Sequence, residues 1–292
     1  MKKVVSLFTL FTALFFVGCA PVPPQNEQNT REEKLQIMTT FFPLYVFTKN
    51  VAGDVADTDV LLPPGVGPHE YQAKPGDIKR FGKADILVIN GVQMEEFLDD
   101  MIKSAGKTDL QIVDTSKSIS LIDYDPHIWL SPKNAIKQTE AIRDALMKAD
   151  AKNAPAYQKN ADAFIARLQN LDQEITQKVM TFKTKDFIAF HPAFTYFSRD
   201  YGLNTVAVIE ESPGKEPTPQ YLAHLIDLIR SKRVRAVFSE PQFSPKIVEL
   251  IAEETGITVH ELDPMETGEF RFDAYEIIMK KNLQALEAAF NS

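Results

Sequence analysis

Three of the five histidines in the chain share one kind of position. His69 lies in a proline-rich loop shortly after an expected strand, His127 in a loop that leads into an expected helix, and His191 at the end of an expected strand. Asp263 ends another expected strand, and each of the four residues is next to a proline. Three neutral imidazoles and one carboxylate can complete the tetrahedral shell of a zinc ion. These four residues are therefore the candidate metal ligands.

Glu240 also ends an expected strand and precedes a proline. We expect it to be either a partner of a metal ligand or an alternative carboxylate ligand. His224 is expected to be a surface histidine, because it lies off the apolar face of its expected helix. His260 is expected to be a structural histidine, because it lies inside the last expected strand. The sequence contains no His-Glu-x-x-His motif and no cysteine cluster that would compete for the metal.

The elements that would position these residues alternate between strand and helix. Strands are expected at 35–40, 59–62, 85–90, 110–114, 187–191, 205–209, 235–239 and 257–262, and helices at 75–83, 94–105, 132–149, 193–201, 219–230, 245–255 and from 272 onwards. Such alternation predicts an α/β protein with parallel sheets flanked by helices. In open parallel sheets, ligands bind beyond the carboxyl ends of the strands, which is where the four candidates fall.

A long helix is predicted between the two series of strands, over residues 155–182. Its apolar residues recur at steps of three and four, which places them on one face: Tyr157, Ala161, Phe164, Leu168, Leu171, Ile175 and Val179. A helix of this length spans about 40 Å and would join an N-terminal lobe, 35–154, to a C-terminal lobe, 183–292. A coiled-coil dimer arm is the alternative, and nothing in the sequence favours pairing.

The N-terminus has the pattern of a secretory signal. Two lysines precede an apolar run at 4–17, which is too short for a membrane-spanning helix. Small residues before Cys19 resemble a bacterial lipobox, although Phe16 replaces the usual leucine. We therefore expect a signal peptide at 1–18 and a lipid anchor with a polar, proline-rich tether at 19–34. The alternative is an ordinary signal peptide with a chance cysteine.

Composition excludes several other classes of protein. Cys19 is the single cysteine, so the rest of the chain has neither disulfides nor thiolate ligands. Loss of the signal would remove two lysines and change the net charge from −8 to −10. An acidic chain of this kind is not expected to bind nucleic acid. We expect a monomer.

Several segments together resemble the zinc- and manganese-binding solute-binding lipoproteins of bacterial ABC importers, the zinc-uptake and Tro-type family. They are Gly65-Val66-Gly67-Pro68-His69-Glu70-Tyr71, Asp125-Pro126-His127-Ile128-Trp129-Leu130-Ser131-Pro132, His191-Pro192-Ala193-Phe194-Thr195-Tyr196-Phe197 and Leu262-Asp263-Pro264. The resemblance implies two lobes joined by one long rigid helix, with a metal in the cleft between them held by His69, His127, His191 and Asp263. It further implies an extracytoplasmic protein, anchored to membrane lipid through acylated Cys19, that delivers zinc to an import permease and its ATPase.

The sequence departs from the family pattern at two places. No histidine lies between residues 70 and 126, where many zinc-uptake members carry a histidine-rich loop. The family's Leu-Gly after Leu-Asp-Pro is replaced by Met265-Glu266-Thr267-Gly268. The alternatives to a zinc importer component are a manganese-preferring component or adhesin, and a zinc-dependent hydrolase in which water replaces Asp263. His191 favours zinc, because imidazole suits zinc better than manganese.

Overall fold

The computed structural model of the chain describes residues 33–69 and 71–291. Contacts divide the chain after Glu33, and the unit that begins at Lys34 holds all of the secondary structure described here. The predicted signal peptide, Cys19 and most of the tether lie outside the described residues. Among the described residues, no helix is both long enough and apolar enough to cross a membrane.

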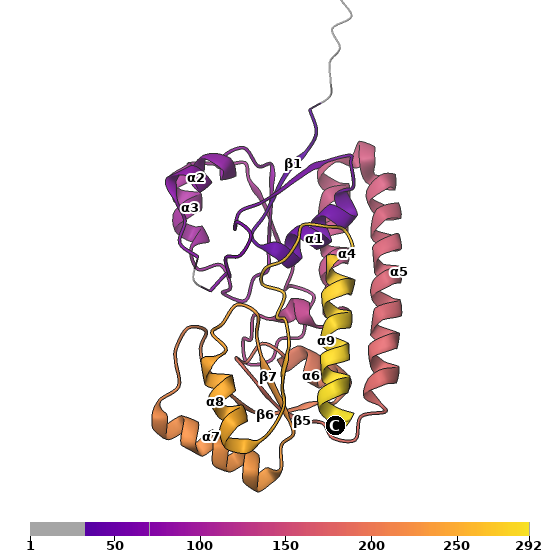
Figure 1. The fold of residues 1–292 in the computed structure, drawn as a ribbon. Helices are drawn as coiled ribbons and strands as arrows, with labels where there is room; N and C mark the ends of the chain where they lie inside the picture. The colour runs from indigo at the N-terminus through magenta and orange to yellow at the C-terminus, as the bar shows by residue number, and fades with distance from the viewer. Residues whose placement is uncertain (1–32, 70, 292) are drawn as a thin grey trace, which may run out of the picture. The chain divides into compact units, whose positions relative to one another are not determined.

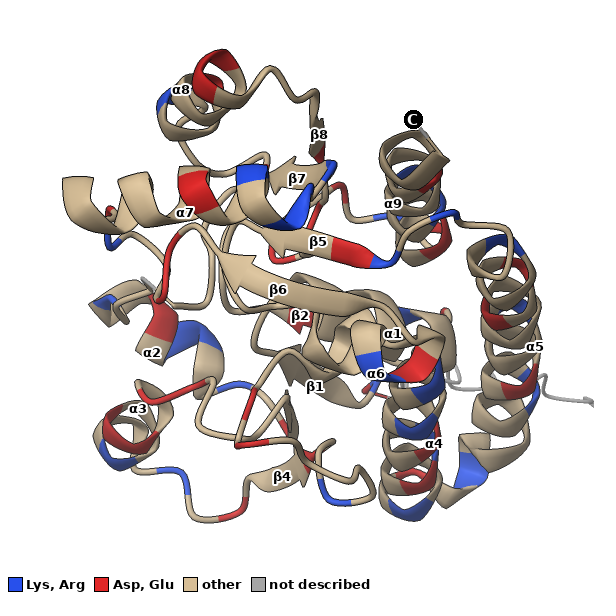
Figure 2. Cartoon of the chain, turned by 90° about the horizontal axis from the view of Figure 1, so that it is seen from below, with Lys and Arg blue, Asp and Glu red and all other residues tan. Residues whose placement is uncertain are grey.

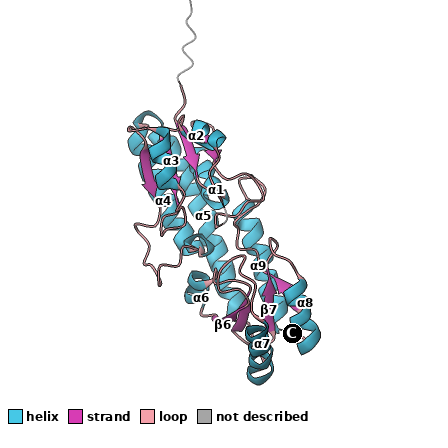
Figure 3. Cartoon of the chain, turned by 90° about the vertical axis from the view of Figure 1, so that its left-hand side faces the viewer, coloured by secondary structure: helices cyan, strands magenta, loops and turns pink. Residues whose placement is uncertain are grey.

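The strands form two four-stranded sheets in which every pair is parallel. The first sheet has the order β2-β1-β3-β4 and contains β1 Gln36–Thr39, β2 Asp57–Val60, β3 Ile86–Ile89 and β4 Gln111–Asp114. The second has the order β6-β5-β7-β8 and contains β5 Asp186–Ala189, β6 Asn204–Val208, β7 Ala236–Ser239 and β8 Val259–Glu261. Figure 3 shows the two groups of strands, each with helices around it. The prediction of an α/β fold with parallel sheets is confirmed.

Helices cover both faces of each sheet, as parallel sheets require. They are α1 Phe42–Ala52, α2 Pro75–Phe81, α3 Leu98–Ala105, α4 Pro132–Ala149, α6 Thr195–Tyr201, α7 Pro219–Lys232, α8 Lys246–Thr255 and α9 Ala274–Asn291, with short 3-10 turns at Ile128–Leu130 and Ala151–Asn153. In the first lobe, α2 and α3 lie on one side and α1 and α4 on the other (Figure 1). In the second lobe, α7 and α8 lie opposite α6 and α9 (Figure 1).

Helix α5, Ala154–Val179, runs alongside both lobes (Figure 1). Its buried residues are the seven of the predicted stripe, Tyr157, Ala161, Phe164, Leu168, Leu171, Ile175 and Val179. They pack against α1 and α4 of the first lobe and against α9 of the second. One hydrophobic core therefore includes residues of both lobes and of α5, so the lobes share packing and are not linked only by a flexible connection.

Charges of both signs cover the outer helices. Acidic and basic residues both occur along α4 and α5 (Figure 2). A nucleic-acid-binding surface gathers lysine and arginine on one face, so these mixed faces are typical of solvated helices.

Candidate metal site

Four side chains converge where loops from the two sheets meet. His69 follows β2 and His127 lies in the loop after β4, whereas His191 follows β5 and Glu266 lies in the loop after β8. Each loop leaves the carboxyl end of a parallel strand, the edge at which such sheets bind ligands. The potential ligand atoms of these four residues all lie within 4.8 Å of one another. The structure thus brings together the three predicted histidines, with two residues supplied by each lobe.

The separations of the donor atoms match those of a tetrahedral metal site. His127 Nε2 lies 3.1 Å from His69 Nε2 and 3.2 Å from His191 Nε2. Glu266 Oε1 lies 3.4, 3.6 and 4.0 Å from the Nε2 atoms of His69, His191 and His127, respectively. Tetrahedral bonds of about 2.0–2.1 Å to zinc place neighbouring ligand atoms about 3.3 Å apart. A single ion of this size therefore fits between the four atoms.

Hydrogen bonds at the Nδ1 atoms of the histidines determine whether each Nε2 atom carries a hydrogen or a free lone pair. His127 Nδ1 lies 2.7 Å from Asp125 Oδ1, and His191 Nδ1 lies 2.7 Å from Glu240 Oε2. A neutral imidazole that donates from Nδ1 presents a lone pair at Nε2. When both Nδ1 atoms donate to these carboxylates, the Nε2 atoms of His127 and His191 point lone pairs at each other, an arrangement that a cation between them would stabilise. Histidine ligands in metal sites commonly have such carboxylate partners.

Burial keeps two of the histidines neutral. His191 is fully buried and His127 is 4% exposed. Desolvation lowers the pKa of His191 to about 4 and also lowers the pKa of His127, despite the hydrogen bond from His127 to Asp125. Both rings are therefore in the form that binds metal at neutral pH.

The carboxylate of Glu266 is held ionised although it is buried. Burial opposes ionisation, but the three imidazole rings that face its carboxylate, that of His69 first, favour the charged form and hold the pKa of Glu266 below its usual value. Its Oε1 atom has no hydrogen-bond partner among the described residues. An ionised buried oxygen that faces three imidazole nitrogens has the chemical type and the position of a candidate metal ligand.

Asp263, the carboxylate expected from the sequence, is not in this group of four. Its Oδ1 atom instead accepts a hydrogen bond of 2.7 Å from the backbone N–H of Met265. The chain turns at Met265, whose φ is 59°, and Glu266 follows directly. The structure therefore brings Glu266 to the histidines in the place expected for Asp263. The only sequence signal for Glu266 was the altered segment after Leu-Asp-Pro.

Glu240 lies beside the ring of His191, one of the candidate ligands. Both of its oxygens lie within 2.8 Å of His191 Nδ1, on the side of the ring away from the other histidines. Burial, followed by the charge of Glu266, raises the pKa of Glu240 well above its usual value. Asp125 has the same role at His127 but was not singled out from the sequence. The spacing Asp-Pro-His was the available signal, because Asp125 also accepts the backbone N–H of His127.

The loop before His127 is held from both lobes. Asn90 donates from its side-chain amide to Pro126 O, and Tyr196 of α6 donates to Asp125 O, both at 2.8 Å. Asn90 in turn is fixed by the buried Glu95, which accepts its backbone N–H at 2.7 Å. His127 is therefore positioned by hydrogen bonds on its backbone as well as on its ring.

Glu95 accepts two further hydrogen bonds, from Thr40 Oγ1 at 2.8 Å and from Gly91 N at 3.1 Å. Burial raises the pKa of Glu95 to about 7, although these donors favour the charged form. Gly91 adopts a positive φ of 83°. Glu95 thus joins the residue after β1 to the segment after β3 and supports the His127 loop indirectly.

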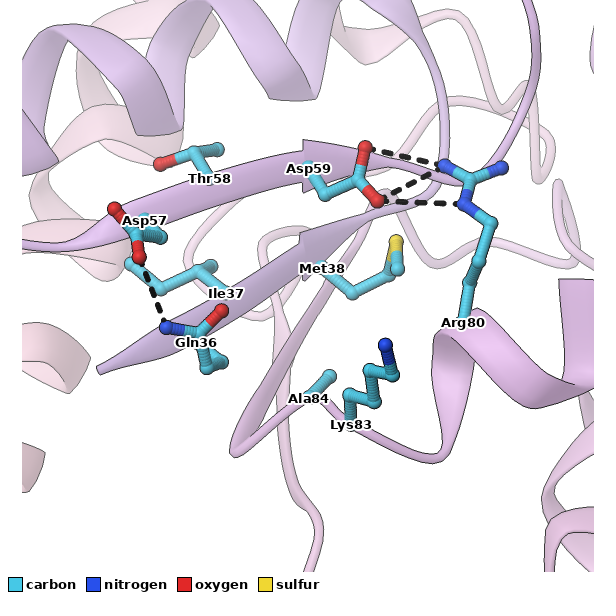
Figure 4. A pocket seen from close by; sticks show the side chains of 9 residues that line it. All are labelled: Gln36, Ile37, Met38, Asp57, Thr58, Asp59, Arg80, Lys83 and Ala84. Carbon is cyan, nitrogen blue, oxygen red and sulfur yellow. Dashed lines mark hydrogen bonds and ion pairs between the residues drawn. The ribbon is translucent and has the colours of Figure 1, made fainter. Parts of the chain in front are cut away.

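A separate cavity of about 180 Å³ lies at the β1–β2 edge of the first sheet (Figure 4). Its main charged groups pair with each other. Arg80 forms hydrogen bonds with both oxygens of Asp59, and Gln36 donates to Asp57 (Figure 4). These pairs stabilise the sheet edge and leave the cavity without the converging donors that characterise the metal site.

Several known proteins are similar to this chain over most of its length. A relative named zinc-binding lipoprotein AdcA, from Streptococcus pneumoniae, is 31% identical over 310 residues, covering 98% of this chain and 61% of the relative. The chain therefore spans about three fifths of that relative's length. The high-affinity zinc uptake system protein ZnuA of Bacillus subtilis is 32% identical, with 98% of this chain and 97% of the relative covered. The solved structure of the solute-binding protein FpvC from Pseudomonas aeruginosa in complex with Mn²⁺ matches with a TM-score of 0.81 and 32% identity, over 89% of this chain and 99% of FpvC.

A family model matches residues 37–289, which include both sheets, α5 and all four converging side chains. The chain belongs to the family of the periplasmic component A of zinc-uptake complexes.

Proposed function

We propose that this protein is an extracytoplasmic solute-binding component that captures one divalent metal ion, zinc in preference to manganese, and delivers it to an ABC-type import permease. The observation that carries the proposal is the convergence of three imidazole nitrogens and one carboxylate oxygen within 4.8 Å of one another. The matched family consists of uptake components and not of enzymes. A shell that protein atoms can fill completely is suited to holding an ion, because a catalytic zinc keeps a position open for water.

We assign the ligands as His69, His127, His191 and Glu266. Asp263 was the carboxylate expected from the sequence, and the geometry supports Glu266 in its place because Oε1 of Glu266 faces all three Nε2 atoms. One carboxylate and three neutral imidazoles leave a zinc complex with a single positive charge. Asp125 and Glu240 would orient the rings of His127 and His191 so that their Nε2 atoms face the ion.

The preference for zinc rests on the donor set. Three nitrogens and one oxygen suit zinc, whereas manganese is a harder ion that favours oxygen donors. The relatives from S. pneumoniae and B. subtilis are named for zinc, and FpvC was solved with Mn²⁺, so the fold accommodates more than one ion. The nitrogen-rich shell of this chain therefore supports zinc as the transported ion and manganese as the alternative.

The remaining parts of the proposal concern location and partners. Acylated Cys19 would anchor the protein to membrane lipid, and the segment 19–34 would let the two lobes work in water as a monomer. The partners would be a permease and its ATPase, in line with the name of the matched family as part of an uptake complex.

The proposal is tested by elemental analysis and competition titration of the purified protein. We expect one zinc per chain, and a large loss of affinity in both His127→Ala and Glu266→Gln. His224→Ala is the matched control, since His224 is exposed on α7 and outside the group of four. Zinc binding that is weak and unaffected by the first two substitutions would refute the proposed site.

A further inference from the structure

A buried side-chain amide on helix α9 holds the loop that carries Glu266. Asn282 of α9 is 3% exposed. Its Oδ1 atom accepts the backbone N–H of Asp263 at 2.8 Å, and its Nδ2 atom donates to the backbone carbonyl of the same residue at 2.8 Å. An amide is the side chain that can satisfy both backbone groups of one residue at once. Asp263 is therefore fixed in position by α9, just beyond the end of β8.

The side chain of Asp263 then sets the direction in which the loop continues. Its Oδ1 atom accepts the N–H of Met265 at 2.7 Å, which closes a tight turn. Met265 is fully buried and has a φ of 59°, in the left-handed region that residues other than glycine seldom adopt. Such a conformation persists only where surrounding contacts impose it. The hydrogen bond from Met265 to Asp263 is one such contact, and it lies one residue before Glu266.

A further contact joins this loop to the segment that carries His127. Trp129 is fully buried and donates from Nε1 to the carbonyl of Pro264 at 2.8 Å. Tyr275 of α9 donates to the carbonyl of Trp129 at 2.8 Å. Pro264, in the Glu266 loop, is thus held against Trp129, which lies two residues after His127.

The carboxylate of Glu266 has little else to hold it. Its Oε1 atom has no hydrogen-bond partner among the described residues. Its Oε2 atom packs against the backbone at Gly67, where a Cβ atom would lie only 2.8 Å away. The position of Glu266 therefore depends on the path of its own backbone.

We infer that Asp263 and Asn282 are positioning residues, which direct Glu266 onto the metal without touching the metal themselves. Asn282 fixes the backbone of Asp263, and Asp263 fixes the turn at Met265 from which Glu266 projects. The inference rests on the proposed function, because it assigns a role in building the same site. It also gives Asp263 a role other than that of a ligand.

The test compares zinc affinity across a small set of variants, measured by chelator competition on the folded protein. Asp263→Ala and Asn282→Ala should each weaken zinc binding by about 10- to 100-fold, the range expected for outer partners of metal ligands. Asp263→Asn keeps an oxygen that can accept from Met265, so it should recover most of the loss seen in Asp263→Ala. Gln284→Ala is the matched control, because Gln284 is exposed on the same helix, and it should leave affinity unchanged.

Two further measurements separate positioning from a general loss of structure. In a Glu266→Gln background, Asp263→Ala and Asn282→Ala should cause no further loss of affinity, because the group that they position is already gone. The visible spectrum of the cobalt-loaded protein should change in Asp263→Ala in the same direction as in Glu266→Gln. If Asn282→Ala does not fold, the comparison of Asp263→Ala with Asp263→Asn decides the question.

The outcomes distinguish this inference from the proposed function. A wild-type protein that binds no zinc overturns both. If zinc binding depends on Glu266 but is unaffected by the variants at 263 and 282, the inference alone fails. If Asp263→Asn loses as much affinity as Asp263→Ala while Glu266→Gln retains it, Asp263 is itself the ligand and the inference is overturned.

Discussion

Replacement of His127 by alanine should abolish most of the stabilisation that zinc confers on the fold. His127 is the central donor, since its Nε2 atom lies within 3.2 Å of the Nε2 atoms of both other histidines. With free zinc at about 1,000 times the dissociation constant, binding stabilises the native state by about 4.1 kcal/mol. Residues 34–292 form one unit and should unfold together.

The expected shift in melting temperature follows from the size of that unit. An unfolding entropy of about 2.1 cal/mol/K per residue gives about 0.54 kcal/mol/K for the whole unit, so 4.1 kcal/mol raises the Tm by about 8 °C. Loss of a residue that only hydrogen-bonds to a metal ligand weakens metal binding by up to about 100-fold. Loss of a ligand itself should therefore weaken zinc binding by about 100-fold or more. At the same zinc concentration, the stabilisation would then fall to about 1.4 kcal/mol or less, which is about 3 °C.

The assay is a thermal melt of each protein with zinc and with a chelator, and the quantity compared is the zinc-induced shift. The absolute Tm is not suitable, because removal of a buried imidazole also changes the metal-free protein. His224→Ala controls for binding to surface histidines and should keep the full shift. A wild-type shift near zero, or an equal shift in His127→Ala, would refute the reasoning.

Zinc should displace manganese from the wild-type protein in competition titrations. His191→Glu should reduce the preference for zinc, because it exchanges a nitrogen donor for an oxygen donor. A wild-type protein that prefers manganese would overturn the assignment of zinc. Zinc affinity should persist below the ordinary pKa range of histidine, because burial lowers the pKa of His191 to about 4 and also lowers the pKa of His127. If titrations across pH show that most of the loss occurs above pH 6, burial does not control ligation by these two rings. Glu95→Ala should lower the free energy of unfolding, measured by urea titration, by about 3 kcal/mol or more, because three donors lose their acceptor. A loss below about 1 kcal/mol would contradict this role of Glu95. Cys19→Ala should move the full-length protein from the detergent phase to the aqueous phase, and unchanged partitioning would remove the predicted lipid anchor.

Strands and the long helix were predictable because their patterns are local. Each strand of both sheets was expected close to where it occurs, since short β-branched runs are bounded by turns. The stripe on α5 was read from a spacing that only one helical face can satisfy. Helix α1 was not predicted, because its sequence lacks such a local pattern. Nine of its eleven residues are buried, so it has no polar face to produce a period.

The convergence of the three histidines was predictable, but the position of Glu266 beside them was not. His69, His127 and His191 follow strand ends, and the parallel topology brings strand ends together. The choice between Asp263 and Glu266 depends on the path of a loop. That path turns at Met265, a residue type that gives no sequence signal for a positive φ. Loop paths set by long-range contacts, such as those of Asn282 and Trp129, leave no periodicity to read.

The exposure of His69 has a consequence for how quickly a bound ion could leave. Its side chain is 23% exposed, whereas those of His127, His191 and Glu266 are at most 5% exposed. An incoming donor can therefore reach the ion from the side of His69, and zinc tolerates a fifth ligand during exchange. His69 would be the first group displaced, while the three buried groups still hold the ion. The rate of transfer to an acceptor would then be governed by His69, and the strength of retention mainly by the buried groups.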